Sequence, residues 1–122
     1  MSVVEFQNLP LADRDRNWDG SSANKRVREW ANAQDEPNER YRKAFVWYDA
    51  ENKDNFTAYK FQIADVVDGK LKAVPRGVFA SAVVMQGGRS GANLPEKDID
   101  RVKSHLGRYY GKMNEAAPWD ES

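Results

Sequence analysis

Hydrophobic residues recur at helical spacing in three segments of the chain. The clearest segment begins at Pro95, where apolar side chains follow the i, i+3, i+7, i+10, i+14 pattern of one helix face. Residues 23–33 show a shorter stripe of this kind, and Ser21 or Ser22 is placed to cap its first turn. The segment that starts at Pro75 is apolar on almost all sides, which predicts a buried helix. The stripe after Pro95 consists of Ile99, Val102, Leu106, Tyr109 and Met113.

Between the helix predicted at 23–33 and the helix that starts at Pro75, the sequence is typical of β-strands. Residues 42–49 are rich in aromatic and β-branched side chains and predict one strand. In 56–67, apolar and polar positions alternate, which predicts a second, half-buried strand. Asp68-Gly69 is a tight-turn signal, and the KLKAV that follows predicts a short third strand. The order of elements predicts an α+β fold, a small, mainly antiparallel sheet packed by about three helices.

The length of the chain, 122 residues, predicts a single domain. We expect a partly irregular N-terminal arm in 1–20, the α+β domain in 21–113, and a mobile tail in 114–122 that is anchored at Trp119. No apolar run approaches the roughly 20 residues that span a bilayer, so we expect no membrane contact. The N-terminus also lacks the basic and apolar regions of a signal peptide, which predicts a protein made and used inside a cell or in a particle assembled there.

The composition limits the chemistry that the chain can perform. It has 19 Lys and Arg, 19 Asp and Glu, one His and no Cys. The lack of Cys excludes a disulfide scaffold, a thiolate metal site and a Cys nucleophile. The lone His105 has a serine beside it, but adjacent helical residues point apart, so we expect a boundary residue bonded to a backbone group or a carboxylate. Among the charged residues, Arg76 and Arg89 could each pair with Asp65 or Asp68.

Two loops have a loose similarity to ligand-binding motifs. DAENKDN, at 49–55, lacks the central Gly and the terminal Glu of a calcium loop, so a polar hairpin loop is the better interpretation. GGRSG, at 87–91, could cradle a phosphate, but no Lys-Ser/Thr pair follows it, and we interpret it as the end of a helix. We therefore expect no metal, no cofactor and no catalytic residue, and we do not expect an enzyme.

Several blocks of the sequence together resemble a known bacteriophage domain. They are Trp18-Asp19-Gly20, Asn55-Phe56 to Tyr59-Lys60, Ala64-Asp65-Val66, Pro75-Arg76, Gly87 to Gly91, and His105-Leu106 with Tyr109-Tyr110. With these blocks, residues 9–119 are similar to a small domain that recurs in head-morphogenesis proteins of tailed bacteriophages. That domain is often appended to prohead-protease polypeptides. The region that would hold the protease is absent here, so we do not carry protease activity over.

This resemblance implies a non-enzymatic virion or assembly protein that binds the capsid shell, as a head-decoration protein or an assembly accessory. Its partners would be the major capsid protein or other virion proteins, with self-association as a further option. Its location would be the phage head, assembled in the host cytoplasm. We expect docking through aromatic and basic side chains, and the arm 1–17 or the tail 114–122 could order on the partner. The predicted partner-binding residues are Trp18, Trp47, Trp119, Arg76 and Arg89.

A second class of function stays open from the sequence alone. A DNA-binding accessory protein could contact phosphates through Arg76, Arg89, Arg101 and Arg108. Steep salt dependence would identify such binding, whereas a contact built on aromatic burial would change much less with salt. A hydrolase that uses His105 as its base and a host-directed inhibitor are the remaining alternatives.

Overall fold

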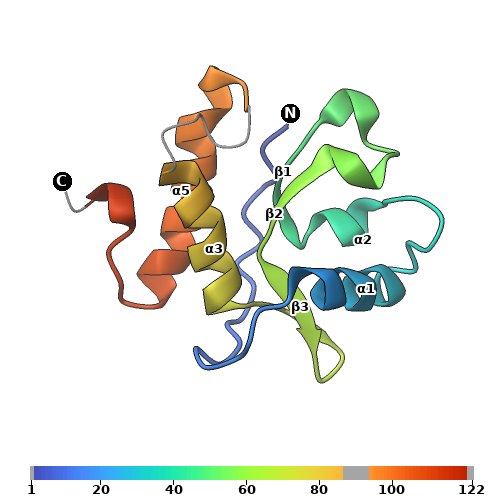
Figure 1. Ribbon diagram of the computed structural model, residues 1–122, viewed down its shortest axis with the longest axis horizontal. Helices are drawn as coiled ribbons and strands as arrows, with labels where there is room; N and C mark the ends of the chain where they lie inside the picture. The colour runs from blue at the N-terminus through green and yellow to red at the C-terminus, as the bar shows by residue number, and fades with distance from the viewer. Residues whose placement is uncertain (1, 87–93, 121–122) are drawn as a thin grey trace.

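The computed structural model describes residues 2–86 and 94–120. Within these two ranges the chain forms four α-helices and two antiparallel sheets of two strands each, which confirms the predicted α+β class. Figure 1 shows two of the helices packed as one layer, the strands in the middle, and the other two helices beyond the strands. No helix in the described ranges is long and apolar enough to cross a membrane.

Three helices begin close to the predicted positions, and the short helix α2 (Glu39–Arg42) was not predicted. Helix α1 spans Gly20–Trp30, α3 spans Pro75–Gln86 and α5 spans Glu96–Lys112. The cap of α1 differs from the prediction, because the carboxylate of Asp19 accepts the backbone N–H groups of both Ser21 and Ser22. Asp19 has the extended backbone of a capping residue, so the two serines lie within the first turn instead of preceding it.

The apolar stripe predicted on the last helix faces the interior. Val102, Leu106 and Tyr109 are fully buried on α5, and Met113 is buried just after it. They form one core with residues of α3 and of the first sheet. The expectation that α3 is buried on nearly all sides is wrong. Only one of its faces packs against α5 and the strands, and Val83 and Val84 on the other face are exposed.

The predicted second strand is two strands that belong to different sheets. Strand β1 (Phe45–Tyr48) pairs with β2 (Tyr59–Gln62), and β3 (Ala64–Val67) pairs with β4 (Lys70–Ala73). Between them, Ile63 donates its N–H to Ala44 and accepts from Val74 through its C=O. Phe61 has a φ of 64°, a left-handed conformation that interrupts regular strand geometry. One sheet is therefore replaced by two that meet at a buried isoleucine.

The hairpin between β3 and β4 follows the prediction. Asp68 and Gly69 both have positive φ, at 53° and 78°. A type I′ turn requires positive φ at both central residues, and Asp-Gly is a favoured pair for it. The tight turn fixes the register in which Asp65 lies opposite Lys72.

The N-terminal arm pairs with both sheets. Val4 donates its N–H to Val46 of β1, and Tyr48 of β1 donates to Ser2. Further along the arm, Ala73 of β4 donates to Pro10 and accepts from Ala12. Figure 1 shows the arm, in dark blue, passing between the α3–α5 layer and the strands. Residues 2–12 are therefore ordered by the rest of the chain without any partner.

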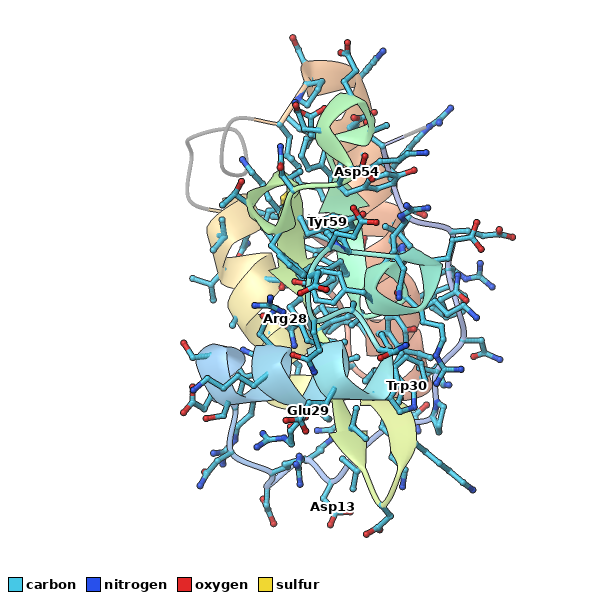
Figure 2. The ribbon with its side chains drawn as sticks, turned by 90° about the vertical axis from the view of Figure 1, so that its right-hand side faces the viewer. Asp13, Arg28, Glu29, Trp30, Asp54 and Tyr59 are labelled. Carbon is cyan, nitrogen blue, oxygen red and sulfur yellow. The ribbon has the colours of Figure 1, made fainter. Side chains whose placement is uncertain are left out.

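A second core lies under α1 and α2. Its centre is a group of aromatic rings in contact with one another, formed by Tyr41, Phe45, Phe56 and Tyr59. Two arginines cover its edge: the guanidinium of Arg28 lies 3.7 Å from the centroid of the Phe56 ring, and that of Arg40 lies 3.9 Å from Trp30. Figure 2 shows Arg28 and Trp30 on α1 and Tyr59 above this helix in the view. The basic side chains here cover aromatic surface, an arrangement that stabilises both groups.

A buried carboxylate connects three parts of the chain. The Asp65 side chain on β3 is only 2% exposed and accepts hydrogen bonds from Arg26 of α1 at 2.8 Å to each oxygen. Arg16 of the arm donates to the same carboxylate at 3.0 Å. The suggested pairing of Asp65 with Arg76 is wrong, since Arg76 donates to Asn17 instead. Arg89 lies outside the described residues.

These bonds determine how Asp65 responds to pH. Burial raises the pKa of the Asp65 carboxyl, but the hydrogen bonds from Arg26 and Arg16 outweigh burial and leave that pKa below its ordinary value. A carboxyl whose pKa is depressed in the folded state stabilises the fold above the unfolded-state pKa, and this stabilisation is lost as the pH falls through the folded-state pKa. Asp65 therefore contributes to acid unfolding only below the ordinary carboxyl pKa of 3.8.

We expect Asp65→Asn to lower the free energy of unfolding at pH 7 by about 2 kcal/mol, because it leaves two partly exposed guanidinium groups without their counter-charge. Urea unfolding followed by circular dichroism measures the change. Asp100→Asn, at an exposed carboxylate on α5, is the control and should change the free energy by less than about 0.5 kcal/mol. Equal stability of the two variants would show that the Asp65 pairs do not hold the elements together.

Candidate functional site

The exposed side of α3 is an apolar surface. Val83 is 67% exposed and Val84 is 45% exposed, and in the described part of the chain they are the only large hydrophobic side chains that are this accessible. Ala80 lies one turn earlier and is also exposed. Arg76, in the first turn of α3, is exposed on the same side of the helix. Residues spaced by three or four positions share one helix face. We call Arg76, Ala80, Val83 and Val84 the α3 face.

A shallow groove borders this face. Phe61 and the stem of Lys60, both from β2, lie on one side, and Ala80, Ser81 and Val84 lie on the other. The groove encloses about 440 Å³ and only apolar atoms are accessible in it. The Lys60 ammonium lies 5.7 Å from the centroid of the Trp47 ring. An apolar groove beside two exposed valines is the kind of surface that other proteins bury.

The three predicted tryptophan anchors lie on different elements and do not form one site. Trp47 is 7% exposed and donates its indole N–H to the buried carboxylate of Asp98 at 2.9 Å, so it belongs to the core. Trp119 lies in the short 3-10 turn η3 (Pro118–Asp120) and contacts the Tyr110 ring edge-on. Trp18 covers the backbone of Gly77, where an added Cβ would lie 3.1 Å from the indole ring.

Of the predicted binding residues, Arg76 is the one on the α3 face. Its guanidinium donates to the side-chain oxygen of Asn17 at 3.1 Å, which places it beside the Trp18 indole that covers Gly77. Sequence reasoning missed Val83 and Val84, because a helix that is apolar all round is normally buried. Their signal in the sequence was their spacing from the exposed Arg76, at i+7 and i+8.

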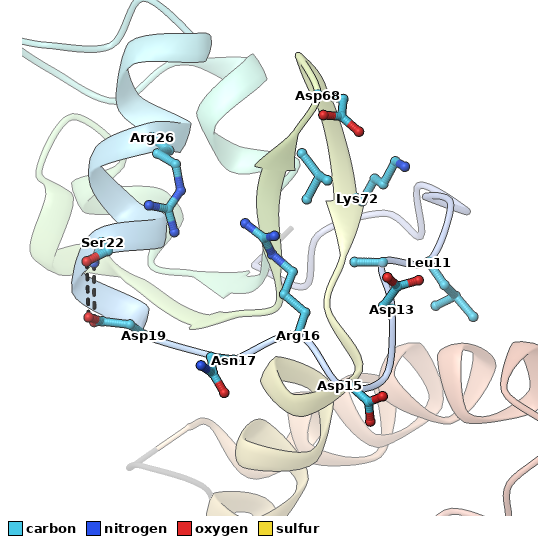
Figure 3. Close-up of a pocket in the computed structure, with 12 residues that line it drawn as sticks. Leu11, Asp13, Asp15, Arg16, Asn17, Asp19, Ser22, Arg26, Asp68 and Lys72 are labelled. Atoms are coloured by element: carbon cyan, nitrogen blue, oxygen red, sulfur yellow. Dashed lines mark hydrogen bonds between the residues drawn. The ribbon is translucent and has the colours of Figure 1, made fainter.

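A polar cleft of about 830 Å³ lies between the arm, α1 and the β3–β4 hairpin. Figure 3 shows that charged side chains of both signs line it. Its cations are largely engaged, because Arg16 and Arg26 bind Asp65. Among its carboxylates, Asp19 caps the N-terminus of α1, and hydrogen bonds from Ser22 hold the pKa of Asp19 below its usual value. The lining is Leu11, Ala12, Asp13, Asp15, Arg16, Asn17, Asp19, Ser22, Arg26, Val67, Asp68 and Lys72.

The charged side chains that line the cleft have a structural role. The bonds of Arg16 and Arg26 to Asp65 hold the arm, α1 and the hairpin to one another, so two of the three cations in the lining already have a partner. No group of three or more metal-ligating side chains capable of holding an ion occurs among the described residues. The cleft therefore supports the fold, and the α3 face is the better candidate for binding.

His105 is a buried histidine bonded to the backbone, as the sequence predicted. Its Nδ1 lies 2.8 Å from the carbonyl oxygen of Val4, and because a carbonyl can only accept, Nδ1 carries the proton and donates. The rings of Phe6 and Tyr109 lie against it. Burial lowers the pKa of the imidazole to about 4, so the ring is neutral at pH 7. His105 holds the arm against α5.

Comparison with known proteins adds no relative. No family model, no curated protein and no solved structure matches this chain. The likeness to the phage head domain therefore rests on the sequence blocks alone.

The lowered pKa of His105 predicts a change in stability at a higher pH than the change expected from Asp65. A histidine whose pKa is lower in the folded state than in the unfolded state stabilises the fold fully above the unfolded-state pKa, near 6.5, and loses this contribution as the pH falls toward 4. We expect the free energy of unfolding to decrease by about 3 kcal/mol across this range in the native chain. In His105→Gln, which keeps a donor for Val4, this decrease should disappear.

The titration itself can be observed directly. The chain has a single histidine, so the NMR signal of its imidazole C–H protons is unambiguous. The midpoint should lie near pH 4 in the folded protein. A midpoint near the ordinary value of 6.5 would mean that the ring is solvated and that the arm is not held by this bond.

Proposed function

We propose that this chain is a non-enzymatic protein of the tailed-phage head that binds the capsid shell, as a decoration protein or an assembly accessory, through the α3 face. The observation that carries the proposal is the exposure of Val83 and Val84 on a helix whose other side is core. The resemblance of residues 9–119 to a domain of head-morphogenesis proteins supports the shell as the partner.

The chemistry of the α3 face favours a protein partner. Apolar anchors at i, i+3 and i+4 match the way in which a helix is received by an apolar groove of another protein. The face has one cation, Arg76, at its N-terminal end, so most of the contact would be burial of aliphatic surface. Such a contact depends weakly on salt, because no condensed counterions are released when it forms.

The small size of this surface is compatible with binding to a shell. Burial of two partly exposed valines contributes only about 1–2 kcal/mol each, which is weak for a single site. A capsid presents the same site many times, and a protein that also contacts its neighbours on the shell gains avidity from that repetition. The α3 face therefore suits a repeating partner better than a single soluble one.

We expect Val83→Ser combined with Val84→Ser to weaken shell binding about tenfold or more, because both aliphatic anchors are lost. Both residues are exposed, so the fold should keep its stability. Co-sedimentation with empty capsid shells of the encoding phage measures saturable binding. It should change little between about 50 and 200 mM salt, whereas a phosphate contact would weaken strongly over this range.

The matched control is Thr57→Ser combined with Gln34→Ser, two exposed positions away from α3. This variant should pellet with shells as the native chain does. The proposal fails if the native chain does not pellet saturably, or if the double valine variant pellets with unchanged affinity.

A further inference from the structure

Four cationic side chains lie along one face of α5. Lys97, Arg101, Arg108 and Lys112 are separated by four, seven and four positions, which brings all of them to the same side of the helix. All four are exposed, and Ser104, also exposed, lies between the middle two. With a rise of 1.5 Å per residue, the row extends over about 22 Å. We call these four residues the α5 stripe.

The N-terminal arm forms the second wall of a groove along this stripe. One hollow of about 460 Å³ is lined by Ser2, Lys97, Asp98 and Arg101. Another of about 210 Å³ is lined by Val3, Val4, Phe6, Arg101, Ser104, His105 and Arg108. Arg101 belongs to both linings, so the two hollows lie next to each other between the arm and the helix. We call the two hollows together the groove.

The stripe is held in place by contacts with the arm. The guanidinium of Arg108 lies 4.0 Å from the centroid of the Phe6 ring. The Lys112 ammonium donates to the carbonyl oxygen of Leu9 at 2.6 Å. Both contacts use one part of the cation and leave further N–H donors. The cations are therefore positioned in advance along the groove.

Few opposing charges face this groove. The Asp98 carboxylate lines it but is buried and accepts the indole N–H of Trp47. His105 is neutral at pH 7, because burial lowers its pKa to about 4. The exposed acids nearby are Glu5 on the arm, and Glu96 and Asp100, which lie on a neighbouring side of α5. The α5 stripe is thus a row of four cations on a chain that as a whole has no net charge.

We propose that the groove between α5 and the arm binds the phosphodiester backbone of a nucleic acid, with Lys97, Arg101, Arg108 and Lys112 as the phosphate contacts. A straight row of cations fits a polymer whose charge repeats at regular intervals. An acidic protein surface would need apolar anchors between the charges, but Val4 is buried and Phe6 lies beneath Arg108. Contacts of this type carry no base information, so binding is independent of sequence.

This inference does not rest on the proposed binding to the capsid, because it uses a different surface. It also changes the set of phosphate contacts expected from the sequence. Arg101 and Arg108 share the groove, whereas Arg76 lies on α3 and donates to Asn17. Lys97 and Lys112 were not among the phosphate contacts expected from the sequence, because the arm that lies beside this side of α5 is distant in sequence.

The test is fluorescence anisotropy with labelled single-stranded and double-stranded DNA, across a salt series. For four phosphate contacts, the slope of log Kobs against log salt should be about −2.8 for the single strand or about −3.6 for the duplex. Tighter binding to one of the two DNAs, with the slope expected for it, identifies whether the groove prefers single-stranded or double-stranded nucleic acid. Lys97→Gln combined with Arg101→Gln should make the slope less steep by about 1.4 to 1.8 and weaken binding at low salt at least tenfold.

The control variant is Lys25→Gln combined with Lys70→Gln, which removes the same charge from exposed positions on α1 and β4. It should retain the native slope. If the first variant unfolds, as circular dichroism would show, Lys97→Gln alone should still reduce the slope by about 0.7 to 0.9. The Val83→Ser and Val84→Ser variant should bind DNA normally, and the Lys97→Gln and Arg101→Gln variant should still pellet with shells.

Three results would overturn the inference. These are no binding to either DNA at low salt, an equal loss of affinity in the control variant, or competition by polyglutamate that is as effective as competition by unlabelled DNA. The last result would assign the groove to an acidic protein.

Discussion

The carboxylate of Asp65 is the point at which three separate parts of the chain are tied together. Arg26 brings α1 to β3, and Arg16 brings the arm to the same place. A single buried charge would be costly, but here two guanidinium groups and the Val66 N–H satisfy it. The two arginines that satisfy this anion, Arg16 and Arg26, also line the polar cleft.

The N-terminal arm, which carries Arg16, also forms part of the candidate surface along α5. It pairs with β1 and β4, and His105 fixes its first residues to α5. Held there, it becomes one wall of the groove along the α5 stripe. It also passes between the strands and the α3–α5 layer (Figure 1). An irregular segment is thus a structural part of the fold.

The two surfaces differ in their physics, and the difference separates the two proposals. The α3 face offers aliphatic area and one cation, so its binding is governed by burial. The α5 stripe offers a row of four cations, so we expect binding of a nucleic acid there to be governed by the release of counterions. A chain with both could join a protein shell to the nucleic acid beside it. The zero net charge of the chain does not reveal the α5 stripe, because a total charge does not say how the charges are distributed over the surface.

Local patterns in the sequence determined the positions of α3 and α5 and the Asp68-Gly69 turn, since periodicity and turn chemistry act over a few residues. Only the tertiary structure decided the division of 56–67 at Ile63, the partners of Asp65 and His105, and which tryptophan is buried. It also decided that Val83 and Val84 stay exposed. Which face of a helix is covered depends on elements that are distant in sequence, and no local pattern contains that information.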